Sequence, residues 1–148
     1  MRGDDGAESE GNIMPQVSQL FFKTAIVFLI VGIAVGFQMA ISADHSVFPA
    51  HAHINLLGWV TSAIFGGYYA LNPAKAQQKL AMVHYGVYTV GLVVMSPALY
   101  LMLRGNPSLE PLVIVGSLIV AAGVLIFAFM VFSSETARAP VPQASVAH

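Results

Sequence analysis

The sequence has no cysteine among its 148 residues. This absence excludes disulfide scaffolds, thiolate metal sites, iron–sulfur clusters and a catalytic cysteine. Charged residues are also scarce, at 9% of the chain, whereas a typical soluble domain has about 25%. Six Lys and Arg against seven Asp and Glu give a formal net charge of −1. The chain therefore has no basic field for nucleic acid, and nucleic-acid binding is excluded.

Apolar residues are abundant instead, at 57% of the chain, with a mean hydropathy of +0.75. They gather in four long stretches. At about 1.5 Å per residue, each stretch is long enough to cross a hydrocarbon core of about 30 Å. We therefore expect an all-α integral membrane protein, with residues 19–132 forming a four-transmembrane-helix bundle in the lipid bilayer. The stretches are 20–41, 50–71, 80–103 and 111–132.

Proline and glycine mark the expected ends and contacts of these helices. Pro49 suits the first turn of the second helix, and Asn72-Pro73 should end it. Pro97 predicts a kink in the third helix, which neighbouring helices can accommodate. Pairs of glycines are expected to permit close helix packing. These pairs are Gly32 with Gly36, and Gly86 with Gly91.

The distribution of positive charge predicts the orientation, because Lys and Arg in short loops stay cytoplasmic. Only Arg104 falls on the side opposite the two termini. We expect a multi-pass protein of the cytoplasmic (inner) membrane with both termini in the cytoplasm. Residues 1–18 are expected to be a disordered tail without the basic start of a signal peptide, and 133–148 a flexible tail. The positive residues on the cytoplasmic side are Arg2, Lys23, Lys75, Lys79 and Arg138.

The start of the second helix carries unusual polar residues for a membrane span. His51, His53 and Asn55 fall in its outer third, where polar side chains are costly and usually functional. Residues two apart on an α-helix point about 200° away from each other. His51 and His53 therefore cannot be the two axial ligands of one haem iron, but they can serve two sites on opposite faces.

The run His51-Ala52-His53, followed by Gly58 and by Phe-Gly-Gly-Tyr-Tyr at 65–69, resembles subunit I of the haem-copper oxidases and nitric oxide reductases. In particular, residues 49–101 resemble the short four-helix membrane proteins related to that subunit. Subunit I has twelve helices in three groups of four, so the resemblance implies a ring-like homo-oligomer, a homotrimer. It also implies one haem b at each interface, with iron held by His51 of one protomer and His53 of the next.

The sequence departs from that family at the second metal. The oxidases hold copper with three further histidines, one of them cross-linked to a tyrosine, and no such set is present. The remaining histidines are His45 in an outer loop, His84 in the third helix and His148 in the tail. We therefore expect a haem b (iron) protein acting in electron transfer or in binding a diatomic gas such as O2 or NO. Whether it is an enzyme stays open.

Three other side chains are candidates near this haem. Trp59, one and a half turns from His53, is placed to pack on a porphyrin. Met95 lies level with His53 and offers a His/Met alternative, although packing is the simpler interpretation. His84 is 13 residues nearer the cytoplasmic side than His53, or about 20 Å. We expect His84 to reach the headgroup region, with a quinone or proton-uptake role as the alternative.

Two other interpretations remain open. A haem-free membrane protein would bind copper or zinc through His45, His51 and His53 near the outer surface, because imidazole suits both metals. In the second interpretation, the chain is an oligomeric accessory subunit of a respiratory complex. The expected partners are further copies of the chain, and a quinone or an electron-transfer protein.

Overall fold

The computed structural model describes residues 14–133, and within that range every element is a helix, which confirms the predicted all-α class. Residues 1–13 and 134–148 lie outside the described part, and most of the two predicted tails falls there. The first helix begins at Gln16, earlier than the expected stretch from residue 20. The elements are α1 (Gln16–Ser42), α2 (Phe48–His53), the π-helix η1 (Ile54–Thr61), α3 (Ser62–Leu71), α4 (Pro73–Ala76), α5 (Lys79–Leu103), the 3-10 helix η2 (Pro107–Leu109) and α6 (Glu110–Phe132).

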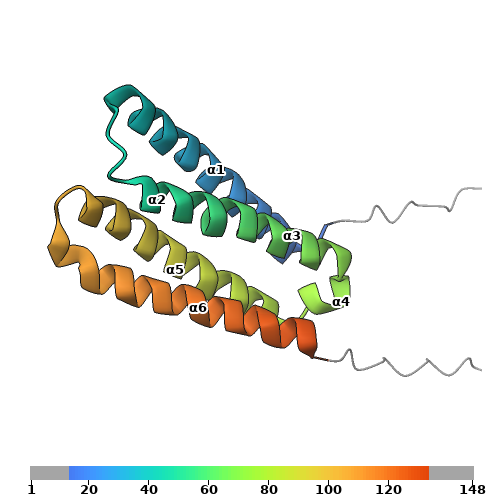
Figure 1. The fold of residues 1–148 in the computed structure, drawn as a ribbon. Helices are drawn as coiled ribbons and strands as arrows, with labels where there is room; N and C mark the ends of the chain where they lie inside the picture. Colours follow the sequence, from blue (N-terminus) through green and yellow to red (C-terminus); the bar gives the residue numbers. More distant parts are fainter. Residues whose placement is uncertain (1–13, 134–148) are drawn as a thin grey trace, which may run out of the picture.

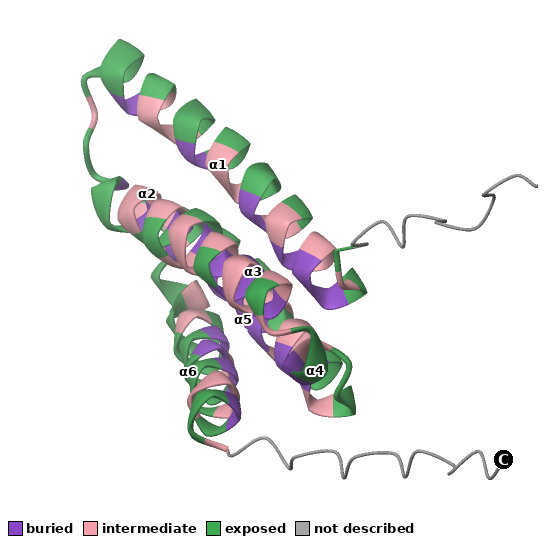
Figure 2. Ribbon diagram, turned by 90° about the vertical axis from the view of Figure 1, so that its right-hand side faces the viewer, coloured by how far each residue is buried: buried purple, intermediate pink, exposed green. Residues whose placement is uncertain are grey.

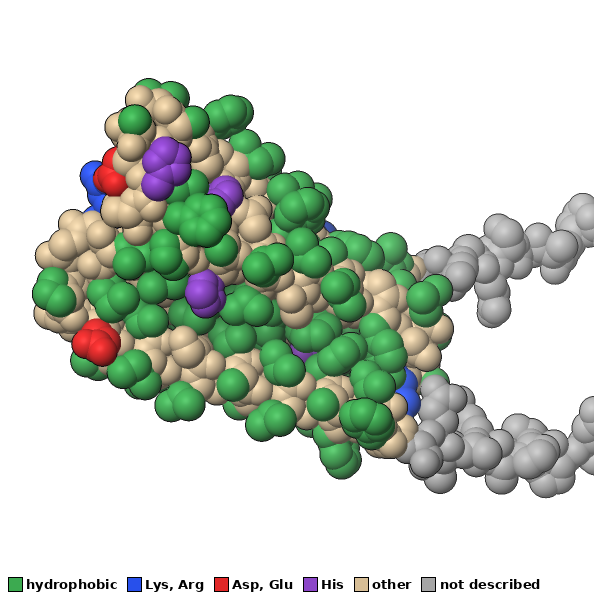
Figure 3. All heavy atoms as spheres, in the orientation of Figure 1, with side chains coloured by type: hydrophobic (Ala, Val, Ile, Leu, Met, Phe, Trp, Pro, Cys, Tyr) green, Lys and Arg blue, Asp and Glu red, His purple; other side chains and the backbone are tan. Residues whose placement is uncertain are grey.

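Three helical segments are long and apolar enough to cross a membrane: α1, α5, and η2 together with α6 (Pro107–Phe132). Their surfaces are apolar as well, because large side chains such as Ile30, Phe37 and Leu118 are more than half exposed. On the face shown in Figure 3, hydrophobic side chains cover the middle, and charged side chains lie toward the ends. Such a surface suits lipid rather than water, so the chain is a membrane protein.

The second apolar stretch forms one continuous helical run over residues 48–71, made of α2, η1 and α3. The junction residues Ile54 and Ser62 keep right-handed helical angles, with φ and ψ of −57° and −45°, and of −62° and −40°. Pro49 lies in the first turn, as predicted. The run stops at Leu71, just before Asn72-Pro73, also as predicted.

The middle of this run, η1, was not predicted, because the sequence was interpreted as a regular α-helix. A π-helix bonds each N–H to the carbonyl five residues earlier and is usually found as a short interruption at functional sites. Two side-chain donors support η1 here. Thr61 Oγ1 donates to the carbonyl of Leu56 at 2.7 Å, and Tyr88 Oη of α5 donates to the carbonyl of Leu57 at 3.0 Å.

The helices form two antiparallel pairs (Figure 1). One pair is α1 with the α2–η1–α3 run, and the other is α5 with α6. The start of α1, α4 and the end of α6 lie together at one end of the bundle, here called the α4 end. The opposite end, here called the η2 end, holds the 43–47 loop and η2.

Glycines let the second pair of helices approach closely. A Cβ on Gly91 would lie 2.7 Å from the backbone nitrogen of Val120, and one on Gly116 would lie 2.7 Å from that of Met95. The prediction for Gly91 is therefore confirmed. It is wrong for Gly86, where a Cβ would meet nothing within 4 Å, because no described neighbour packs on that side of α5.

The buried core lies mainly toward the α4 end, where the helices converge (Figure 2). Large aromatic side chains fill it, and Phe21, Tyr69 and Tyr88 are fully buried. Phe21 contacts the Phe65 ring edge-on at a centroid distance of 5.5 Å, the geometry that aromatic pairs prefer. The other members of this cluster are Val17, Ala81, Leu92, Met95, Val120 and Met130.

Candidate functional site

His51 lies half-buried between α2 and α1. Its ring covers Gly36, where a Cβ would come within 3.2 Å of His51 Cε1. One turn along, Asn55 covers Gly32 so closely that a Cβ there would lie 2.5 Å from Asn55 Oδ1. The prediction of close packing at these two glycines is confirmed. Their missing side chains make room for the imidazole and the amide of the neighbouring helical run.

His53 points out of the bundle and is exposed. Its Nδ1 lies 2.7 Å from the carbonyl oxygen of Pro49. A carbonyl only accepts hydrogen bonds, so Nδ1 is the donor, and in the neutral imidazole Nε2 is then the nitrogen with the lone pair. Metal-bound histidines are usually held by a hydrogen bond of this kind from the other ring nitrogen. Ala52, Leu56 and Leu57 complete a small apolar hollow of about 180 Å³ at this ring.

The two histidines therefore face different surroundings, as the helical spacing predicts. His51 contacts α1, and His53 faces the outside of the described chain. Asn55 Nδ2 donates to the carbonyl oxygen of His51 at 2.9 Å and lies 3.3 and 3.4 Å from the two ring nitrogens. The segment thus offers one imidazole with a polar neighbour and one with an apolar neighbourhood.

Trp59 lies on η1 and is 36% exposed. Its neighbour Gly58 is buried, and a Cβ there would lie 2.3 Å from Phe28 Cδ1 of α1. The close approach of Phe28 fixes the middle of the run against α1.

His84 is fully buried, so the expected contact with the headgroup region is wrong. The physical reason is that α5 packs against all the other long helices, and His84 faces this core rather than lipid. The Tyr69 hydroxyl lies 2.9 Å from His84 Nδ1 and donates to Met130 Sδ at 3.0 Å, whereas His84 Nε2 has no partner in the described part of the chain. Aromatic rings of α1, α3 and α6 enclose the imidazole, namely Phe21, Phe65 and Phe127.

Met95 and His45 have contrasting environments. Met95 is 2% exposed and belongs to the core cluster, where its backbone contacts Gly116. This placement accords with packing, and it does not bring Met95 together with the exposed His53. His45 is exposed in the loop before α2, and its carbonyl accepts a hydrogen bond from Phe48 N at 3.0 Å.

The described residues of one chain do not bring three histidines together at a metal site. Histidines show on the face formed by α2 and the loop before it (Figure 3). Within residues 14–133, however, no three His, Asp or Glu side chains come close enough to hold a metal ion together. The copper or zinc alternative through His45, His51 and His53 would therefore need a change of shape or a second chain.

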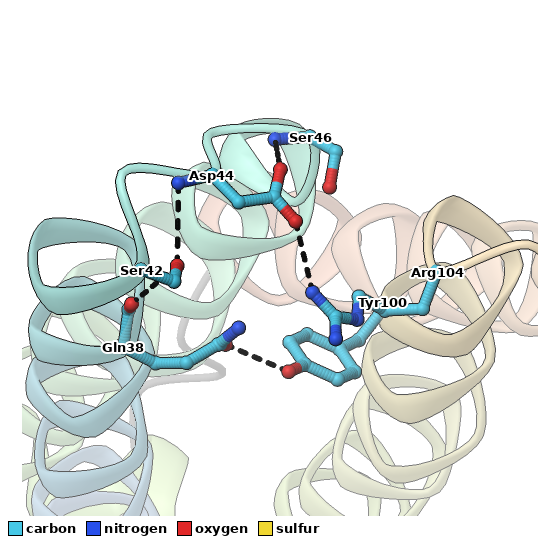
Figure 4. A network of polar contacts seen from close by, with 6 residues as sticks. All are labelled: Gln38, Ser42, Asp44, Ser46, Tyr100 and Arg104. Carbon is cyan, nitrogen blue, oxygen red and sulfur yellow. Dashed lines mark hydrogen bonds and ion pairs between the residues drawn. The ribbon is translucent and has the colours of Figure 1, made fainter.

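A polar network at the η2 end fixes the loop that leads into α2 (Figure 4). Arg104 at the end of α5 forms an ion pair with Asp44 at 2.9 Å. The Asp44 carboxylate accepts a hydrogen bond from Ser46 N at 2.9 Å. Tyr100 Oη donates to Gln38 Oε1 at 2.7 Å, which links α5 to α1. The hydrogen bonds from Ser46, and then the Arg104 charge, hold the pKa of Asp44 below its ordinary value.

Two polar contacts were not predicted from the sequence, those of Arg104 and of Lys75. Arg104 and Lys75 were used only as markers of the two membrane sides. Lys75 is 4% exposed, and its Nζ donates to the carbonyl oxygens of Met130 and Ser133 and to Ser133 Oγ. A cation at these last carbonyls complements the α6 macrodipole. The sequence signal for the Arg104 ion pair was the opposite charge of Asp44, which lies in the other loop at the η2 end.

Comparison of this chain with protein-family models, with curated proteins and with solved structures finds no match. The resemblance to subunit I of the oxidases therefore rests on residues 49–101 of the sequence alone.

Proposed function

We propose that this chain is a membrane haem b protein that carries electrons or binds a diatomic gas, with His51 and His53 as ligands of haem iron. The observation that carries the proposal is the His53 imidazole. The Pro49 carbonyl orients it through Nδ1, its Nε2 makes no hydrogen bond within residues 14–133, and the ring stands in an apolar hollow on an exposed face. Without a cysteine, the haem is held noncovalently.

The residues around the second histidine fit a haem as well. His51 lies over Gly36, where no side chain blocks the ring. Asn55 stands beside the same imidazole and is a hydrogen-bond partner that sets its orientation. A bound haem would supply an iron that exchanges one electron, or that binds a gas where one axial position is open. The chain contributes the two imidazoles, their orientation and an apolar environment that excludes water.

The proposal includes a fourth membrane crossing. The helical run over residues 48–71 comprises 6, 8 and 10 residues in its three parts, or about 36 Å at helical rise. This length is sufficient to cross a bilayer alongside the three longer helices. We place the chain in the cytoplasmic (inner) membrane, with the α4 end facing the cytoplasm. The η2 end and the two histidines then lie near the outer surface.

The proposal also includes a homotrimer. His51 and His53 face different surroundings. A haem held by His51 of one chain and His53 of another would therefore join two different faces of the two chains. Such a head-to-tail interface closes as a ring rather than as a twofold dimer. Three four-helix chains would match the twelve helices of the oxidase subunit. An electron-transfer protein or a quinone is the proposed redox partner.

The test is the visible absorption spectrum of the purified protein, recorded oxidised, dithionite-reduced, and reduced under carbon monoxide. We expect a reduced b-type spectrum with about one haem per chain, and a carbon monoxide shift only where an axial position is open. A colourless protein from haem-sufficient cells contradicts the proposal. Bound copper or zinc in that colourless protein would favour the alternative metal-binding function.

A further inference from the structure

Two hollows follow one another along the seam between α1 and α5, starting at the α4 end. The first, here called the end hollow, has a volume of about 360 Å³ and lies where both helices begin. Three amide side chains and one cation line it, namely Gln16, Gln77, Gln78 and Lys79. The second, here called the side hollow, has a volume of about 240 Å³ and lies farther along both helices, beside Lys23 of α1. The surface of the end hollow is partly polar, whereas that of the side hollow is apolar.

The two hollows lie on the same face of α5. Lys79 and Met82 line the end hollow, and Thr89 and Val93 line the side hollow. Helical spacing places these four residues on one side of the helix, with Gly86 in the middle. A Cβ on Gly86 would meet nothing within 4 Å. The path from one hollow to the other is therefore open, and one elongated ligand can occupy both.

Two exposed lysines lie along this path, Lys79 at the end hollow and Lys23 at the side hollow. A helical side chain leans toward the N-terminus of its helix, so the stem of Lys23 leads toward the end hollow, where α1 begins. Its ammonium can then reach the membrane surface, as long basic side chains do near helix ends. The two acidic residues that the structure describes, Asp44 and Glu110, lie at the η2 end. The seam therefore presents two cations at the α4 end, and an anion is the complementary ligand.

A phospholipid combines the two chemistries that the seam offers. Its phosphate can lie in the end hollow, where ammonium groups and glutamine NH2 groups are donors. Its acyl chain can follow the apolar face past Gly86, where Val27 and Val93 are 58% and 57% exposed. Lys79 and Thr89 are ten residues apart, or about 15 Å along α5, which is the depth of one leaflet of a hydrocarbon core of about 30 Å. Basic pockets between membrane helices bind anionic headgroups in this way.

We propose that the seam between α1 and α5 binds one anionic phospholipid from the leaflet at the α4 end, with its phosphate at Lys79 and Lys23 and an acyl chain along the side hollow. A zwitterionic lipid offers the same chain, but its own cation offsets the charge that the lysines attract. The seam therefore distinguishes lipids by the charge of the headgroup. The proposal is independent of the haem, because neither His51 nor His53 lines either hollow.

The test is native mass spectrometry of the full chain in mild detergent, titrated with phosphatidylglycerol or with phosphatidylcholine of the same two acyl chains. We expect phosphatidylglycerol to bind more tightly, by about tenfold or more. Lys79→Gln and Lys23→Gln should each weaken phosphatidylglycerol binding about fivefold and leave phosphatidylcholine binding unchanged. The double variant should bind the two lipids equally. A natural chain without a headgroup preference, or a double variant that keeps the preference, would overturn the proposal.

Arg104→Gln is the charge-matched control. It also removes one positive charge, but at the η2 end, where the guanidinium is paired with Asp44. It should leave the headgroup preference unchanged. A loss equal to that of Lys79→Gln would attribute the preference to net charge alone and would overturn the proposed site.

Gly86→Trp tests the path of the acyl chain without a change of charge, because its Cβ points into open space. It should weaken the binding of both lipids about fivefold. Glycerol phosphate separates a lipid site from a site for a free anion, since it has the phosphate without the chains, and we expect it to displace phosphatidylglycerol poorly. Displacement by glycerol phosphate, together with unchanged lipid binding in Gly86→Trp, would indicate a free-anion site and contradict the lipid proposal.

Discussion

The two ends of the bundle differ in how far they bury a histidine. At the α4 end, His84 is fully buried, and α1, α3 and α6 supply the aromatic rings around it. At the η2 end, His53 is exposed, and among the described residues it is hydrogen-bonded only to a carbonyl of its own helix. The closed end encloses its histidine in the core, whereas the open end leaves its histidine at the surface. The difference lies in how many helices converge on each residue rather than in the residue type.

The largest expected effect separates the histidines of the two ends. If the protein binds haem as proposed, His53→Ala should lower the haem content about tenfold or more, because an axial ligand is lost. His84→Ala should destabilise the core but leave the ligation spectrum of the remaining holoprotein unchanged. His45→Ala is the surface control. Haem content per chain and the reduced spectrum measure both outcomes, and an unchanged spectrum in His53→Ala would remove this residue from the ligand set.

The second prediction tests how closely the helices approach in the α5–α6 pair. Gly91→Ala places a Cβ 2.7 Å from the backbone of Val120, and overpacking of this kind costs about 1–3 kcal/mol of unfolding free energy. Gly86→Ala on the same helix meets open space and should stabilise the helix by about 0.5–1 kcal/mol. Unfolding in detergent measures both variants. Equal stability of the two would contradict the close α5–α6 contact.

The third prediction compares one tyrosine hydroxyl from each end. Tyr69→Phe leaves His84 Nδ1 buried without its partner. This change should lower the unfolding free energy by about 1–3 kcal/mol. Tyr100→Phe removes the part-buried bond to Gln38, whose amide can bind other donors near the surface, so the loss should be smaller. Thermal unfolding of the two variants in the same detergent checks this order, and a larger loss in Tyr100→Phe would reverse the comparison of the two ends.

The smallest expected effect is at the exposed Asp44–Arg104 ion pair. The folded state holds the pKa of Asp44 below its ordinary value of 3.8. Its stabilising contribution is therefore present above that ordinary value and is lost as the pH falls through the lower, folded pKa. Asp44→Asn should remove this acid dependence, and salt should weaken the ion pair of the natural chain. Unfolding between pH 2 and 5, at low and high salt, measures the effect, with Ser117→Ala on α6 as the control.

The candidate site could be predicted from the sequence only in part. Helical geometry predicts that His51 and His53 face different surroundings, and in the structure His51 contacts α1 whereas His53 is exposed. The enclosure of His84 could not be predicted, because depth along a helix says nothing about which side of that helix meets its neighbours. Lys75 was missed for the same reason, since its partners lie 55 and 58 residues away in the sequence.

The amino-acid sequence by itself determined that the chain is an all-helical membrane protein, where its long helices begin and end within a few residues, and that two imidazoles face opposite sides of one helix. These properties depend on local composition, on proline positions and on a fixed helical repeat. Only the tertiary structure decided the π-helical segment η1, the use of Gly32 and Gly36 to accommodate Asn55 and His51, and the burial of His84 among aromatic rings. These features depend on contacts between residues distant in sequence, which no local pattern encodes.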